Sequence, residues 1–107
     1  MSVTVRERRG QLRIAAAYPV VIRDRRRRII AKGRTANISI GGVYALLPMR
    51  EEFKPQATFN VELSLPDFSS PRRISMSRIV EYRCRIVRIE PLGHMLGVGI
   101  EFLEKLA

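Results

Sequence analysis

The chain has 107 residues, of which 46% are hydrophobic and 28% are charged, a composition that fits one globular domain and excludes a disordered polymer. It contains no apolar run near the ~20 residues of a membrane-spanning helix, and no apolar segment that would make its N-terminus a signal peptide. The single cysteine, Cys84, excludes an internal disulfide and is typical of the reducing cytoplasm, where we expect the protein.

The net charge of +10 is concentrated in the first third of the chain. Residues 1–34 hold 11 Lys and Arg against 2 acidic residues, a balance of +9, whereas residues 35–107 hold 9 against 8, a balance of +1. A local positive field favours a phosphate or polyanionic ligand and accelerates its association. An arginine-rich surface that only maintains solubility is the alternative.

Residues 1–12 carry few large aliphatic side chains and show no clean periodicity. We therefore predict that residues 1–13 form a flexible, arginine-rich, ligand-binding arm and that residues 14–107 form the folded domain. The first strand is predicted at residues 18–22, which are mostly β-branched. Pro19 would lie near its start, where a missing N–H is tolerated.

Residues 24–28 read Asp-Arg-Arg-Arg-Arg and cannot lie in a core, so we predict a loop or hairpin tip there. These arginines either contact a phosphate or a partner, or are simply solvated. Two further strands are predicted at residues 28–39 and 43–47, the second ending at Pro48. A loop follows up to residue 56.

The second half of the chain continues the pattern of strands. Residues 59–65 alternate apolar and polar side chains, which indicates a half-buried strand. Residues 74–89 form a long extended stretch whose apolar parity reverses at Val87, and this reversal predicts a break or bulge. The last strand is predicted at residues 97–102.

About six strands, separated by turns and without a confident long helix, favour an all-β fold, either an antiparallel barrel or a sandwich. A closed barrel would also remove exposed strand edges. We further consider a short helix that begins at Glu104 and ends with the chain at Ala107. Residues 66–71 have the composition of a turn.

The sequence shows no arrangement typical of a catalytic or metal site. His94 is the only histidine, and no cysteine or acid is spaced from it as a second metal ligand. A Cys84–His94 dyad would lack an orienting third group, and the parity of its stretch places Cys84 among core side chains. No glycine-rich loop ends in Lys-Ser or Lys-Thr, so the sequence contains no phosphate-binding P-loop. We therefore expect no enzyme activity, no metal and no cofactor.

The segment Asn37-Ile38-Ser39-Ile40-Gly41-Gly42 has the composition of a binding site. Its isoleucines alternate as apolar anchors, and the glycine pair ends the strand. The amide and hydroxyl supply donors and acceptors, and glycine lets a ligand approach the backbone. Such groups can bind the polar edge of a flat molecule. The same residue types are also common in ordinary turns.

Two arginines four residues apart, Arg9 and Arg13, precede this segment. The chain thus carries an Arg-x-x-x-Arg element followed by Asn-x-Ser-x-x-Gly, with Asn37, Ser39 and Gly42 at the fixed positions. This pair of elements resembles the PilZ domain, the bacterial receptor module for cyclic di-GMP. The resemblance extends to the last strands and covers nearly the whole chain.

The resemblance implies a six-stranded antiparallel PilZ-type β-barrel and a non-catalytic receptor whose ligand, the second messenger cyclic di-GMP, lies between the two elements. An arginine fork matches both the adjacent N7 and O6 acceptors of guanine and a phosphate. Arg8 lies at a position that the family associates with binding one or two ligand molecules; here it either holds a stacked ligand dimer or adds one more charge. The ligand-binding residues are therefore expected to be Arg8, Arg9, Arg13, Asn37, Ser39, Gly41 and Gly42.

We expect the ligand to order the N-terminal arm, which would then signal to a downstream protein partner or an attached domain. A nucleic-acid-binding β-barrel is one alternative, but the chain has only three Tyr, four Phe and no Trp for stacking bases, so we expect no specific nucleic acid. A PilZ-fold interaction module that binds no nucleotide is the other alternative. Such a module would show a broken motif, and no motif position is broken here.

Overall fold

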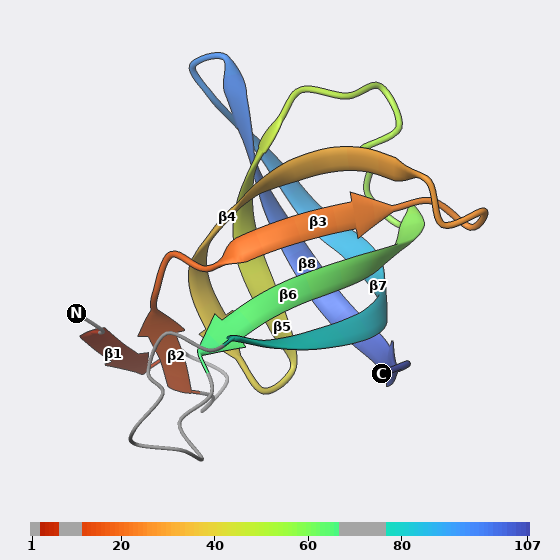
Figure 1. The fold of residues 1–107 in the computed structure, drawn as a ribbon. Coiled ribbons are helices and arrows are strands. Elements are labelled where there is room, and N and C mark those ends of the chain that lie inside the picture. Colours follow the sequence, from red (N-terminus) through yellow and green to blue (C-terminus); the bar gives the residue numbers. More distant parts are fainter. Residues whose placement is uncertain (1–2, 7–11, 67–76) are drawn as a thin grey trace.

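The computed structural model describes residues 3–6, 12–66 and 77–107, and within these ranges the chain is all β. Figure 1 shows the arrangement of the strands. Their bounds are β1 Val3–Arg6, β2 Leu12–Ala15, β3 Pro19–Arg23, β4 Ile29–Ser39, β5 Gly42–Pro48, β6 Thr58–Pro66, β7 Ser77–Leu92 and β8 Met95–Lys105. None of the residues in these ranges belongs to a helix that is long and apolar enough to cross a membrane.

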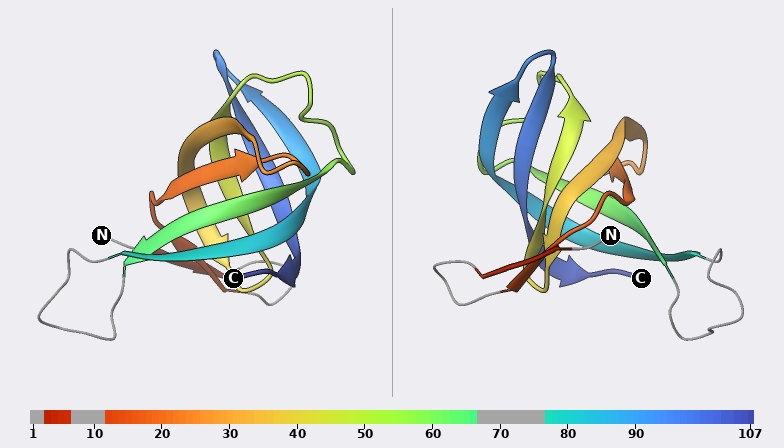
Figure 2. Two further views of the ribbon diagram at one scale, coloured as in Figure 1. Left: turned by 45° about the vertical axis from the view of Figure 1, so that its right-hand side comes forward. Right: turned by 90° about the vertical axis from the view of Figure 1, so that its left-hand side faces the viewer.

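Six of the strands close into an antiparallel barrel, as the two views in Figure 2 show. The order around the barrel is β4-β3-β6-β7-β8-β5, and the pairing of β5 with β4 closes the ring. The predicted six-stranded barrel is therefore confirmed, and the sandwich is excluded. Closure leaves no open edge among these six strands, so each backbone ladder is satisfied by a neighbour.

The core lies inside the barrel and follows the alternation of the sequence, because successive side chains of a strand point to opposite faces. On β5, for example, Val43, Ala45 and Leu47 are buried while Tyr44 and Leu46 are half-buried and outward. Phe53, from the loop after β5, covers one end of the core and contacts Phe59 edge to face, with ring centroids 5.7 Å apart. The other buried apolar residues are Val20, Ile22, Ala31, Val61, Leu63, Val80, Cys84, Ile86, Leu96, Val98 and Ile100.

The long strand β7 carries the irregularity that its parity reversal predicts. Its register with β8 shifts between Ile86 and Arg88, which leaves Val87 as the extra residue of β7, and shifts again between Arg83 and Cys84, where Leu103 of β8 is the extra residue. Bulges of this kind bend a strand and strengthen its twist. They allow the 16 residues of β7 to curve around the barrel. Most of the predicted turn at residues 66–71 lies outside the described residues.

The prediction for the C-terminal end of the barrel domain needs correction. The helix considered at Glu104 to Ala107 is wrong, because β8 continues to Lys105 and pairs there with Tyr82. The flexible arm at residues 1–13 stays a prediction, and among its described residues β1 and β2 pair as an antiparallel hairpin from Val3↔Ala15 to Arg6↔Leu12. Backbone pairing offers these residues hydrogen bonds that their weak apolar pattern does not reveal.

The N-terminal hairpin is joined to the barrel through β4. Strand β2 pairs with β4 at Ile14↔Ile38, beyond the point where β3 leaves the same edge. The linker between β2 and β3 is fixed by Thr35, which is 1% exposed. Its hydroxyl accepts a hydrogen bond from the Tyr18 N–H (2.9 Å) and donates one to the Ala16 carbonyl. The N-terminal hairpin is thereby held beside the C-terminal end of β4.

Candidate ligand-binding site

Four of the expected site residues lie together on the β4–β5 hairpin, which Figure 1 shows in yellow at the lower end of the barrel, beside β1 and β2. A bulge in β4 decides their orientation. Thr35 pairs with the buried Ala45, but Asn37 pairs with the outward Tyr44, so Ala36 is the extra residue. Without this residue Asn37 would share the inward face of Thr35. The bulge therefore turns the Asn37 side chain to the outer surface, where it is half-buried.

Ser39 follows Asn37 on the same outer face and is paired with Gly42 across the turn. Ser39 is 7% exposed, and its hydroxyl donates to the Gly42 carbonyl over 3.4 Å, a long hydrogen bond within the hairpin. The Gly41 carbonyl accepts a hydrogen bond from the Phe102 N–H at 2.9 Å. The turn is therefore tied to β8 and presents its polar groups from a fixed backbone.

Gly42 has a packing role that the sequence does not reveal. A Cβ at this position would lie 2.2 Å from the Ile100 carbonyl oxygen on β8, a distance that real Cβ atoms do not reach. The backbones of β5 and β8 approach so closely here that only glycine fits. The motif glycine is thus required by the barrel itself, whatever its contact with a ligand.

The first motif element reaches the same corner of the barrel through β2. Arg13 immediately precedes Ile14, which pairs with Ile38, and the strands are antiparallel, so the Arg13 backbone lies next to the Ser39 end of β4. The structure therefore brings the two sequence elements together at this one position. Arg8 and Arg9 lie outside the described residues.

Tyr44, which the sequence did not single out, lies beside Asn37 on the outer face, and Arg88 and Glu90 contact Tyr44 from β7. Tyr44 is its cross-strand neighbour and covers Gly97, where an added Cβ would be 1.9 Å from the Tyr44 hydroxyl. Arg88 lies over the Tyr44 ring, 5.6 Å from the ring centroid. The Tyr44 hydroxyl donates to Glu90, and this hydrogen bond raises the pKa of Tyr44. Only the register of three strands brings these residues together, so no local signal could have found them.

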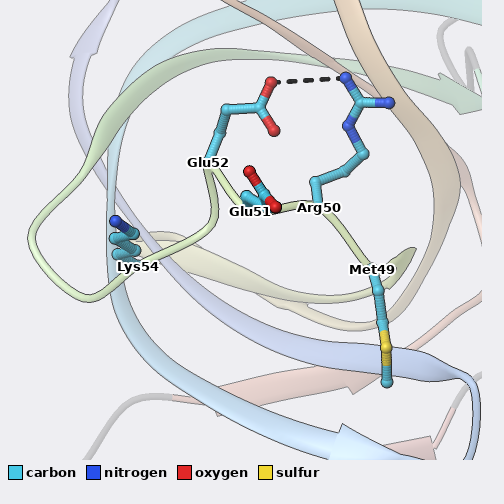
Figure 3. A pocket seen from close by; sticks show the side chains of 5 residues that line it. All are labelled: Met49, Arg50, Glu51, Glu52 and Lys54. Carbon is cyan, nitrogen blue, oxygen red and sulfur yellow. Dashed lines mark hydrogen bonds and ion pairs between the residues drawn. The ribbon is translucent and has the colours of Figure 1, made fainter.

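A hollow of the described surface lies at the opposite end of the barrel. Figure 3 shows that it is formed by one loop, and that the Met49 side chain points away from the rest. Arg50 and Glu52 form an ion pair at 3.4 Å that partly neutralises the loop. Glu51 and Lys54 complete the lining. No group from another strand converges on this hollow, so it lacks the enclosed polar arrangement of a small-molecule site.

The two residues considered for catalysis are not assembled for it. Cys84 is 1% exposed inside the barrel, and burial raises the pKa of its thiol to about 12, so it is protonated at neutral pH. His94 lies in the exposed turn between β7 and β8. Within residues 3–6, 12–66 and 77–107, no three His, Cys, Asp or Glu side chains are grouped closely enough to hold a metal ion.

Comparison with known families gives a match to the PilZ domain over residues 7–106. The match covers almost the entire chain, so the protein belongs to the PilZ domain family, which is a family of non-catalytic cyclic di-GMP receptors. The matched residues include both sequence elements of the candidate site, and the β-barrel agrees with this assignment.

Among solved structures, the inhibitor of motility MotI/DgrA of Bacillus subtilis is similar in fold. The TM-score is 0.73 with 23% sequence identity, and the match covers 94% of this chain. It covers 44% of the MotI/DgrA chain, so the present sequence spans less than half of that protein. A comparison with curated proteins gave no match.

Proposed function

We propose that this domain is a cytoplasmic receptor for cyclic di-GMP that binds the ligand between the N-terminal hairpin and the β4–β5 hairpin. The observation that carries the proposal is the pairing of Ile14 with Ile38, which sets the Arg13 backbone beside the motif residues of β4. The binding residues in this proposal are Arg8, Arg9, Arg13, Asn37, Ser39, Gly41 and Gly42.

The chemistry of these groups suits a cyclic dinucleotide. Cyclic di-GMP carries two phosphates and two guanines, and each is matched by a planar arginine fork. No lysine occurs in the first 31 residues, so the basic side chains near the site are all arginines. The guanidinium of arginine can bind a phosphate or a guanine edge through two hydrogen bonds at once. Asn37 offers an amide on the outer face, where it could meet a guanine edge. The ligand would also neutralise part of the +9 charge of residues 1–34.

The weak attachment of the N-terminal hairpin supports a mechanism. Strand β2 is paired with β4 only at Ile14↔Ile38, whereas β5 and β8 are paired from Gly42↔Glu101 to Pro48↔Met95. A ligand that contacts both hairpins would add the hydrogen bonds that this short ladder lacks. The N-terminal hairpin then becomes ordered on a nearly unchanged barrel, and a partner protein or an attached domain responds to its new position.

Calorimetric titration tests the proposal with cyclic di-GMP, GMP and a short single-stranded oligonucleotide. Only cyclic di-GMP can engage both elements at once, so its affinity should exceed that of GMP at least about tenfold, the equivalent of one charged hydrogen bond. Equal affinity for cyclic di-GMP and GMP, or no binding of either, would contradict the proposal. Preferential binding of the oligonucleotide would favour a nucleic-acid-binding barrel instead.

A matched pair of variants separates the site from bulk charge. Arg13→Ala removes a proposed ligand contact and should weaken binding about ten- to a hundredfold, since hydrogen bonds to charged groups contribute about 1.5–3 kcal/mol. Arg26→Ala removes the same charge from the exposed β3–β4 turn and should change affinity little at moderate salt. Comparable losses in both variants would indicate a nonspecific anion binder.

A further inference from the structure

A second basic surface lies at the β3–β4 turn, at the right-hand side of the barrel in Figure 1. A hollow opens there between the turn, the first residues of β6, the middle of β7 and the end of the chain. Its lining residues are Arg25, Arg27, Thr58, Phe59, Asn60, Arg83 and Leu106. We call this surface the arginine hollow.

Asp24 fixes the conformation of the turn. Its Oδ1 accepts hydrogen bonds from the N–H groups of Arg26 and Arg28, both at 2.9 Å, and its Oδ2 accepts one from the Arg28 Nε at 2.9 Å. Bonds from the Arg28 and Arg26 backbone and from the Arg28 side chain hold the pKa of Asp24 below its usual value. The turn is therefore a defined scaffold at neutral pH, from which Arg25 and Arg26 project.

Arg27 occupies a position of the turn at which glycine is usually preferred. Its φ is 66°, in the left-handed region where three-residue hairpin loops usually have glycine. The Arg27 guanidinium lies 3.2 Å from Oε1 of Glu81, whose side chain is 8% exposed. A side chain kept at a position that favours glycine is expected where it serves a contact or a function.

The charged side chains of the turn and its neighbours leave an excess of positive charge at the tip of the turn. Three pairs are formed, Arg28–Asp24, Arg27–Glu81 and Arg83–Glu104. The part of the chain that the structure describes contains no ion-pair partner for Arg25 or Arg26, so five arginines face three carboxylates, a balance of +2. These two exposed cations are available to an external anion.

The arginine hollow also has an apolar side. Phe59 is half-buried, and Leu106 is 41% exposed. Arginine beside aromatic and aliphatic groups is the composition of a protein interface, in which such residues often contribute most of the binding energy. A single-stranded nucleic acid would need several free aromatic faces for stacking, and Phe59 alone lines this surface.

The arginine hollow is separate from the proposed nucleotide site. The two lie at opposite ends of β4, and the ten residue steps from Ile29 to Ser39 correspond to about 33 Å along the strand. One molecule of cyclic di-GMP cannot contact both. A partner could therefore occupy the hollow while the nucleotide site is filled or empty.

We propose that the arginine hollow docks an acidic segment of a protein partner. Carboxylates of the partner pair with Arg25 and with Arg26, which lines an adjoining hollow together with Arg25 and Phe59. One aliphatic side chain of the partner packs between Phe59 and Leu106. The turn that Asp24 fixes supplies the preorganisation that makes such binding specific.

A labelled peptide of six Asp or Glu residues with one central leucine serves as the probe, and fluorescence anisotropy reports its binding at moderate salt. Replacing Arg25 and Arg26 together by alanine should weaken binding at least about tenfold, since two charge-assisted contacts are lost. Leu106→Ser should also weaken it. Arg78→Ala removes an exposed charge from the start of β7, five residues from Arg83, and should have little effect, as should Arg13→Ala.

Four results would overturn the proposal. They are no binding of the peptide, equal losses in the Arg78 variant and the Arg25/Arg26 variant, equal binding of a peptide without leucine, and tighter binding of a single-stranded oligonucleotide of matched charge. The reciprocal behaviour of the variants keeps the two sites distinguishable. Arg13→Ala should impair only cyclic di-GMP binding, and the arginine-hollow variant should impair only peptide binding.

Discussion

Gly42→Ala tests whether the glycine is needed for the packing of the barrel or only for contact with a ligand. The added Cβ would lie 2.2 Å from the Ile100 carbonyl oxygen and 3.3 Å from its carbonyl carbon. Both atoms belong to the backbone of β8, and Ile100 is 4% exposed in the core. No side-chain rotation can relieve this contact, so the two strands must separate.

The size of the effect follows from that separation. An ordinary C···O approach is about 3.3 Å, so β5 and β8 must move apart by about 1 Å at this point. Overpacking of this kind costs about 1–3 kcal/mol. For a domain of this size, 1 kcal/mol corresponds to about 4–8 °C in Tm, so we expect Gly42→Ala to melt about 4–24 °C lower without any ligand.

Thermal denaturation followed by circular dichroism measures this difference, and Gly99→Ala is the matched control on the neighbouring strand. A Cβ at Gly99 would meet the Arg88 Cβ at 3.4 Å and the Val87 Cγ2 at 3.5 Å, both ordinary contacts with side chains. The control should change stability by less than about 0.5 kcal/mol. If Gly42→Ala melts like the wild type but no longer binds cyclic di-GMP, the packing explanation is refuted and the glycine acts on the ligand.

Three further predictions concern the hairpin, the linker and the core. Amide hydrogen exchange across residues 4–14 should slow when cyclic di-GMP is added, and equal exchange in both states would exclude the N-terminal hairpin as the switch. Thr35→Val removes the bonds to Tyr18 and Ala16 and should lower the free energy of unfolding by about 1–3 kcal/mol, as urea denaturation can measure; an unchanged midpoint would show that the linker is not held by this hydroxyl. Burial raises the pKa of the Cys84 thiol from 9.0 to about 12, so between these values the folded state binds more protons than the unfolded state. The stabilisation from the protonated thiol is complete below pH 9 and is lost as pH rises towards 12. In this range the free energy of unfolding should fall by up to about 1.4 kcal/mol per pH unit. The slope should be smaller in Cys84→Ala, and identical slopes would contradict the raised pKa.

Local patterns of the sequence determined most of the barrel. Alternation of apolar and polar residues is a property of each strand alone, so residues 59–65 and 43–47 were predicted where β6 and β5 occur. The parity reversal at Val87 marked the bulge of β7 for the same reason. Local patterns failed at the C-terminal end of the chain, and they did not reveal the N-terminal hairpin. Residues 104–105 extend β8 because β7 offers a partner, and the N-terminal hairpin forms by backbone pairing that leaves little trace in side-chain periodicity.

The sequence alone also determined which residues make up the proposed nucleotide site, since the two motif elements and their spacing are written in it. The tertiary structure decided how these residues are placed. The unpaired Ala36 turns Asn37 outward, and the Ile14–Ile38 pairing brings the Arg13 backbone beside it. The close approach of β8 explains Gly42. Register and strand separation depend on contacts between segments far apart in the chain, and for that physical reason no local pattern can specify them.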